Sequence, residues 1–289
     1  MLQISWTGTD GSSWDLISGP IALRADGIQG LGMPTTADTV RATGLTHGQT
    51  FQSWRLQPRP FFMPLIFQDA SRYDVQGLQR SFWRSMEVGK YGTLAVTDSA
   101  GYRRSLQLRF VDDVNLSYSV DPYAPVLGEK AFGVNLIADN PFWQGDTESI
   151  TFGLGPGGTA TFFGNGSSAT PFYIVKSAGG TAATLSNFGD LPAYVTYTIA
   201  APMTSFDLTV DGHHVTGAIE LVDDETLTIE TSPQSQIAYK DDGSRMTRYL
   251  TAADFAPVPD SGEPVPIGID VVGTGSVTVS FRPQYMRAF

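Results

Sequence analysis

The chain contains no cysteine and only 3 histidines among its 289 residues. Without cysteine there can be no disulfide bond, no thiolate nucleophile and no zinc site that uses sulfur ligands. Long apolar runs are also missing, because the longest, residues 61–67, is interrupted by Pro64 and is far shorter than a bilayer-spanning helix of about 20 residues. The opening MLQISWTGTDG has neither a basic nor an apolar region, so we expect no secretory signal and a soluble protein made in a cytoplasm, with no membrane partner.

Basic residues are scarce, since 18 Lys and Arg stand against 29 Asp and Glu. This balance argues against nucleic acid as a specific partner, because affinity there comes from Lys and Arg that neutralise phosphates. Residues 1–140 carry 12 basic and 13 acidic side chains, a net charge of −1, whereas residues 141–289 carry 6 and 16, a net charge of −10. All five tryptophans lie in the first 143 residues. We therefore predict two domains, residues 1–145 and residues 146–289.

The composition favours a mainly β protein. The 31 glycines and 18 prolines, together with many Thr, Ser and Val residues, indicate frequent turns between short strands, and 41% hydrophobic residues are enough to build real cores. A length of 289 residues suits two domains of about 140 each.

In the first half, alternating residues around an Asp10-Gly11 turn predict a hairpin. Residues 35–50 indicate a long loop or an extended ribbon, and residues 61–67 a buried strand. One helix is expected from an N-cap at Asp74, through an apolar stripe at Leu78, Phe82 and Met86, to Gly89. A hairpin of residues 93–97 and 105–110 and a strand at residues 131–138 complete this half.

The second half shows only short strand patterns with turn signals between them, which indicates an antiparallel β-sandwich. Residues 250–255 could form one helical turn. The strands are expected at residues 150–154, 159–163, 172–175, 194–199, 206–210, 218–221, 226–229, 267–271 and 276–281.

Patterns that carry chemistry are weak in this sequence. His213 and His214 would point to opposite faces of a strand, and Gly212 favours a turn there; His47 lies in a polar stretch. The Gly-rich residues 153–158 lack the Lys-Ser/Thr of a phosphate loop. We therefore predict no enzyme, no catalytic residues, no cofactor site and no metal site.

Three pairs of adjacent aspartates occur beside expected strand ends, at residues 112–113, 223–224 and 241–242. None has the alternating ligand spacing of a calcium loop, so we interpret them as solvated turn residues, with surface calcium as the alternative.

Several segments, in this order along the chain, resemble the distal tail proteins of long-tailed (siphovirus-type) bacteriophages, in the version common among phages of actinobacteria. The resemblance covers nearly the whole chain. It rests on GIQGLGMP (27–34), FWRSMEVGKYGTLAVTD (82–98), LIADNPFWQGD (136–146), SNFGDLPAYVTYTIAAP (186–202), residues 225–250 and FRPQY (281–285).

The resemblance implies an N-terminal β-sandwich with one helix that assembles as a ring of six, followed by a galectin-like β-sandwich that projects from the ring. Such a ring joins the tail tube to the baseplate hub at the tail tip of the virion and can carry receptor-binding proteins. It implies as partners further copies of the chain, the tail tube, hub and tape measure proteins, and assembly in the host cytoplasm. No catalytic residues are implied.

Two further questions stay open at this level. The aromatic residues of the first half suit either subunit interfaces or two apolar cores. The second domain could bind glycans instead, which usually requires flat aromatic rings, and a wall-degrading enzyme is the remaining alternative. The second half contains no Trp, and the tyrosines available as platforms are Tyr173, Tyr194, Tyr197, Tyr239, Tyr249 and Tyr285.

Overall fold

The computed structural model describes residues 2–24, 27–42, 47–67, 74–114, 131–153, 173–175 and 181–289. Strands dominate these residues, and α1 (Asp74–Arg84) is the α-helix among them, so the mainly β prediction is confirmed. The chain forms two compact units, Met1–Gly145 with Tyr285–Phe289, and Asp146–Gln284. Among the described residues no helix has the length and apolarity needed to cross a bilayer.

The first unit is built on one nine-stranded sheet, in which the main strand order is β2-β1-β7-β8-β9-β6-β3. Its expected hairpins are present: Trp6 pairs with Trp14 across a turn at Gly11, and β7 and β8 are joined at residues 98–102. The strands are β1 (Gln3–Thr7), β2 (Ser13–Asp15), β3 (Ile21–Leu23), β6 (Arg59–Phe67), β7 (Tyr91–Thr97), β8 (Arg103–Val114), β9 (Ala131–Ala138), β10 (Trp143–Gln144) and β22 (Gln284–Tyr285).

The two edges of this sheet come together. The N–H of Leu23, at the end of β3, donates to the carbonyl oxygen of Leu16 over 2.8 Å, and the N–H of Leu16 donates to Ile4 of β1. The sheet therefore curls around an apolar core, as the predicted sandwich requires. Ala288 belongs to this core, and its N–H donates to Leu31, so the last five residues, which the sequence placed in the second domain, pack in the first unit.

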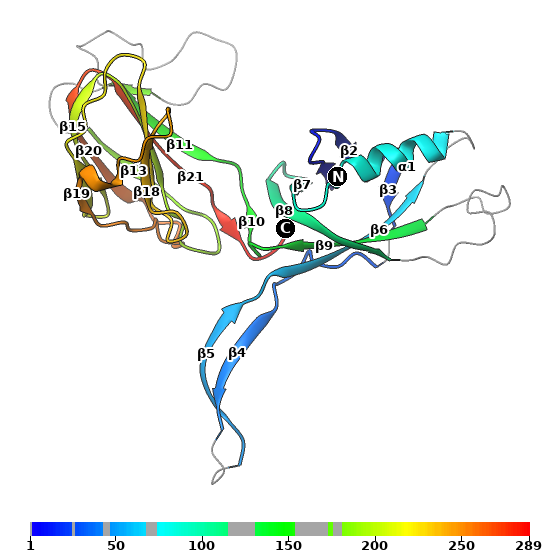
Figure 1. The fold of residues 1–289 in the computed structure, drawn as a ribbon. Helices are drawn as coiled ribbons and strands as arrows, with labels where there is room; N and C mark the ends of the chain where they lie inside the picture. Colours follow the sequence, from blue (N-terminus) through cyan, green and yellow to red (C-terminus); the bar gives the residue numbers. More distant parts are fainter. Residues whose placement is uncertain are drawn as a thin grey trace. The chain divides into compact units, whose positions relative to one another are not determined.

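Figure 1 shows helix α1 beside the sheet of this unit. The helix packs on the sheet through Phe82, which is fully buried and lies 5.4 Å from the Trp14 ring, centroid to centroid. The helix ends at Arg84 and not at Gly89 as predicted. Ser85 explains the early end: its carbonyl oxygen accepts from the N–H of Thr9, and its hydroxyl donates to Phe82 and accepts from the Trp6 indole. These bonds replace further helical ones. The cap expected at Asp74 lies outside the described side chains.

The second unit stacks a six-stranded sheet, ordered β12-β11-β21-β14-β17-β18, on a five-stranded sheet, ordered β13-β20-β15-β16-β19. All pairs are antiparallel except β11 with β12. The six-stranded sheet contains β11 (Glu148–Gly153), β12 (Tyr173–Val175), β14 (Thr196–Ala200), β17 (Thr226–Glu230), β18 (Ile237–Lys240) and β21 (Ser276–Phe281). The five-stranded sheet contains β13 (Thr181–Leu185), β15 (Met203–Val210), β16 (His213–Gly217), β19 (Leu250–Ala253) and β20 (Val265–Gly273).

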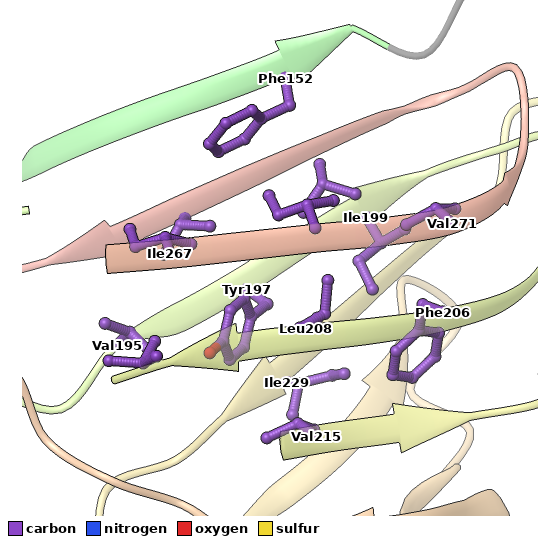
Figure 2. Packing of buried hydrophobic residues seen from close by; sticks show 14 of the residues in the cluster. Phe152, Val195, Tyr197, Ile199, Phe206, Leu208, Val215, Ile229, Ile267 and Val271 are labelled. Atoms are coloured by element: carbon purple, nitrogen blue, oxygen red, sulfur yellow. The ribbon is translucent and has the colours of Figure 1, made fainter. Parts of the chain in front are cut away.

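Alternate residues of both sheets fill the core between them, and Figure 2 shows Phe152, Tyr197, Leu208 and Ile267 meeting there. Because period-2 alternation places one set of side chains inward, most strand predictions are confirmed. The strand expected at residues 218–221 is wrong, since only Leu221 forms a bridge, to Met203. The strand expected at residues 159–163 lies outside the described residues.

A second correction concerns residues 250–255, where one helical turn was expected. The turn is the short 3₁₀ helix η1 (Thr247–Tyr249), and the next residues form β19. Ala253 pairs with Val215 of β16, so the edge of the five-stranded sheet draws this segment into an extended conformation.

Candidate interaction surface

The histidines do not form a chemical site. His213 and His214 lie on β16, so the turn expected for them is wrong; the turn is Asp211-Gly212, whose φ angles of 51° and 79° give a tight hairpin. Nδ1 of His213 lies 2.9 Å from Asp254, and Nδ1 of His214 lies 2.8 Å from Asp207. As neighbours on a strand the two rings point to opposite faces, and each has its own carboxylate.

The aspartate pairs are also separate from one another. Asp112 and Asp113 lie within β8, and not in a turn as predicted; Asp112 accepts a hydrogen bond of 2.6 Å from the Asn135 amide of β9. The pairs at residues 223–224 and 241–242 lie in turns, as expected. Among the described residues, no group of three His, Asp or Glu side chains is placed to hold a metal ion.

The most distinctive surface of the first unit is a two-stranded ribbon, which we call the arm. It consists of β4 (Thr36–Arg41) and β5 (Thr50–Leu56), which form a two-stranded sheet and, among the described residues, pair only with each other (Figure 1). Residues 35–50 were expected to form a loop or a ribbon, and they contribute one strand of this arm. An isolated hairpin is marginally stable in water, so such an arm normally needs further contacts.

One face of the arm carries its large apolar side chains. Asp38 pairs with Trp54, and Val40 pairs with Phe51. Directly paired residues share a face, and a β-bulge between Thr39 and Val40 allows Phe51 and Trp54, three positions apart, to lie on the same side. Phe51 is 57% exposed, Trp54 54% and Val40 39%. A set of large apolar side chains exposed on one face is typical of an interaction site.

The root of the arm is held by Arg59, the first residue of β6. Its side chain is 1% exposed and donates hydrogen bonds to backbone carbonyl oxygens: Nη1 to Gly30 at 2.8 Å and to Gly32, which both precede the arm, and Nε to Pro141, which follows β9, at 2.8 Å. Nη2 donates to Met286 at 2.8 Å. Burial lowers the pKa of the Arg59 guanidinium to about 10, so the group stays charged at neutral pH and can serve all four acceptors.

In the glycine-rich corner before the arm (residues 27–34), one glycine is required for a steric reason. Gly30 has φ +103°, and a Cβ atom there would lie 2.3 Å from Cδ2 of the Phe61 ring. Only glycine allows the chain to pass over this buried ring and present its carbonyl oxygen to Arg59.

Sequence reasoning did not identify Arg59, although a signal was present. Arg59 has the same period-2 phase as Phe61, Met63 and Leu65, which are all buried. A cation in the inward phase of a buried strand predicts a set of buried acceptors.

The sequence left open whether the aromatic residues of the first half serve subunit interfaces or apolar cores, and its tryptophans divide between exposed and buried positions. Trp6 and Trp143 are buried, and Trp14 and Trp83 pack against the core, whereas Trp54 on the arm is exposed.

The tyrosines considered as flat platforms for a sugar in the second half also differ in burial and in the unit to which they belong. Tyr197 is buried, Tyr285 belongs to the first unit with the Arg104 guanidinium 3.8 Å from its ring centroid, and the side chain of Tyr173 lies outside the described residues. Tyr194 and Tyr239 are half-buried, and Tyr249 is exposed.

The fold defines a class, that of two-unit β proteins in which a curled sheet with a helix and an arm is followed by a β-sandwich. The chain is similar in fold to the SPP1 Dit (gp 19.1) protein, a structure described as a paradigm of the hub adsorption apparatus in phages that infect Gram-positive bacteria. The TM-score is 0.61 at 12% identity, over 98% of this chain and 99% of that one. A chain of the phage P2 baseplate, in its activated conformation with Ca, gives a TM-score of 0.56 at 11% identity, over 98% of both chains.

The same baseplate with Sr gives identical values. No protein-family model and no curated protein sequence matches the chain. At 11–12% identity the likeness is one of fold, and it extends over both units.

Proposed function

We propose that this protein is a structural component of a phage tail tip, a distal tail protein of the kind found in phages of actinobacteria. Residues 1–145 act as the ring-forming domain, and six copies surround the central channel between the tail tube and the baseplate hub. Residues 146–289 form a galectin-like sandwich that projects from the ring. The protein has no catalytic role, binds no nucleic acid specifically and does not enter a membrane.

The observation that carries this proposal is the arm. A ribbon that pairs with no other strand in the described part of the chain, and that exposes Phe51 and Trp54 on one face, needs a partner surface. Copies of the same chain, arranged head to tail around a ring, supply one at a fixed position for every subunit. The likeness in fold to a phage Dit protein over 98% of the chain supports the same assignment.

The remaining partners follow from this position. The ring contacts the tail tube protein on one side and the hub and tape measure proteins on the other, and it offers a place for receptor-binding proteins. Assembly takes place in the host cytoplasm. The net charge of −10 on residues 141–289 suits a water-facing domain that should not adhere to its neighbours.

Light scattering on the purified chain at high concentration tests the ring. We expect a hexamer, and we expect the double substitution Phe51→Ser with Trp54→Ser to shift it toward monomer. The matched control is Tyr102→Ser, since Tyr102 is 72% exposed outside the arm. A chain that remains monomeric both alone and when mixed with the tail tube and hub proteins contradicts the proposal. So does electron cryo-microscopy of virions that places another protein at this joint.

A further inference from the structure

The second unit is inserted within the first, because the chain passes between them twice, after Gly145 and after Gln284. The residues that return to the first unit, Tyr285–Phe289, form a segment that we call the strap. Ala288 of the strap is 2% exposed and belongs to the apolar core of the first unit, whereas Phe289 is 61% exposed. The strap is therefore a packed part of the first unit.

Inside the first unit, the strap is bonded to the root of the arm at two points. The N–H of Ala288 donates to the carbonyl oxygen of Leu31 over 2.9 Å, in the glycine-rich corner. The carbonyl oxygen of Met286 accepts from Nη2 of Arg59 over 2.8 Å. The glycines on either side of Leu31 offer their carbonyl oxygens to the same guanidinium. A displacement of the strap must therefore disturb the bonds that fix the corner and the start of the arm.

Inside the second unit, the residue that precedes the strap is held by a tight loop, residues 187–191. The carbonyl oxygen of Gln284 accepts from the N–H of Asp190 over 2.7 Å. The loop is built around the fully buried side chain of Asn187, whose Oδ1 accepts from the N–H of Gly189 over 2.9 Å. A Cβ atom at Gly189 would lie 2.7 Å from the carbonyl oxygen of Gln284, so the loop and this strand leave no free space between them.

We propose that the loop of residues 187–191 and the arm are conformationally coupled through the strap. Met286 lies only two residues beyond Gln284, and an extended backbone is already close to its maximum length of about 3.3–3.6 Å per residue. A displacement of Gln284 is therefore passed on to Met286. The buried Arg59 guanidinium then loses an acceptor, which is costly for a charged donor without access to water, and the corner loosens.

The coupling is reciprocal, because a contact that changes the freedom of the arm must change that of the loop by the same free energy. It gives the second unit a way to control how firmly the arm is held. The coupling does not depend on the tail-tip assignment, since every contact that carries it lies within a single chain.

Hydrogen exchange of the full-length protein, followed by mass spectrometry, tests the coupling from both ends. The reporters in the first unit are the amides of Gln29 and Phe62, which bond to each other's carbonyl oxygens over 3.1 Å beside the corner. Gly189→Ala, a change in the second unit, should speed their exchange about tenfold. The matched control is Gly153→Ala in the same unit, where a Cβ atom has no neighbour within 4 Å, and it should change the exchange less than about twofold.

From the other end, Ala288→Asp places a charge in the core of the first unit and should release the strap. The reporter is then the amide of Asp190 in the second unit, whose exchange should speed about threefold or more. Phe289→Asp adds the same charge at an exposed position and should leave this amide unchanged.

Thermal melts and light scattering verify that the variants are folded and have the oligomeric state of the wild-type protein. Unchanged exchange of Gln29 and Phe62 in folded Gly189→Ala would overturn the proposal. If Gly189→Ala does not fold, Ala288→Asp decides alone, and an unchanged Asp190 amide overturns it. Equal acceleration in either control variant has the same consequence, because the effect would then not pass through the strap.

Discussion

Arg59 is bonded to the segment that leaves the first unit: its Nε donates to the carbonyl oxygen of Pro141 over 2.8 Å, across 82 positions of sequence. The same guanidinium holds the carbonyl oxygens of Gly30, before the arm, and of Met286, in the returning C-terminal segment. One buried cation therefore connects three segments that are distant in sequence.

Arg59→Met should destabilise the first unit by about 3 kcal/mol, because it leaves buried carbonyl oxygens without donors. Tryptophan fluorescence during urea unfolding measures this unit alone, since all five tryptophans lie within it. Arg55→Met, an exposed position on the arm, should change stability by less than about 0.5 kcal/mol. Equal effects of the two substitutions would contradict the role given to Arg59.

Gly30→Ala should destabilise the same unit by about 2–3 kcal/mol. The new Cβ meets the Phe61 ring at 2.3 Å, and the backbone at φ +103° is strained for any residue with a side chain. The control is Gly32→Ala in the same corner, where a Cβ would have no neighbour within 4 Å. A midpoint of urea unfolding that is the same for both alanine variants would show that the close approach is unimportant.

Deleting Gln52 should preserve both self-association and thermal stability. Gln52 is the unpaired residue at the bulge between the Thr39 and Val40 pairs, and its loss leaves a regular strand in which Phe51 and Trp54, then two positions apart, still share a face. Because the arm pairs with no other strand among the described residues, the core should not change. Light scattering and a thermal melt provide the two measurements, and the double substitution Phe51→Ser with Trp54→Ser is the control that should not associate. Loss of association in the deletion variant with an unchanged melt would contradict the role given to this face of the arm.

Asp139 should make stability depend on pH in the acid range. Hydrogen bonds from the Arg109 guanidinium and the Tyr91 hydroxyl hold the pKa of this carboxyl below its usual value. A lowered pKa in the folded state gives stability that is present above the unfolded pKa of about 3.9 and is lost as the pH falls through the lower folded value. Asp139→Asn should therefore lower Tm by about 2 °C at pH 6, a small effect because the pair is partly exposed.

The difference in Tm between the wild-type protein and Asp139→Asn should shrink as the pH falls below about 4. Asp98→Asn is a useful comparison, since Asp98 accepts only backbone N–H bonds, in the exposed turn between β7 and β8. A difference for Asp139→Asn that stays constant from pH 6 to pH 2 would contradict this account.

The sequence by itself determined the mainly β content, the presence of one helix and most of the strands. These depend on local alternation and on turn residues, such as the glycines at 11 and 101, which act over a few positions. Local patterns could not place the helix end at Arg84. The carbonyl oxygen of Ser85 accepts a hydrogen bond from the N–H of Thr9, which lies 76 positions away in the chain. The strand β19 was missed for the same reason, since it forms by pairing with β16, far away in the chain. The histidine strand was missed for a local reason: the tight turn takes up only Asp211 and Gly212, so β16 begins directly after it.

Only the tertiary structure decided which residues form the candidate surfaces. The bulge that brings Phe51 and Trp54 to one face is invisible in a period-2 pattern, because one unpaired residue shifts the phase. The buried role of Arg59 requires acceptors from three distant segments. The alternation of apolar and polar residues along a strand predicts whether each side chain points inward or outward, but only the packing of the whole chain determines which side chains become neighbours.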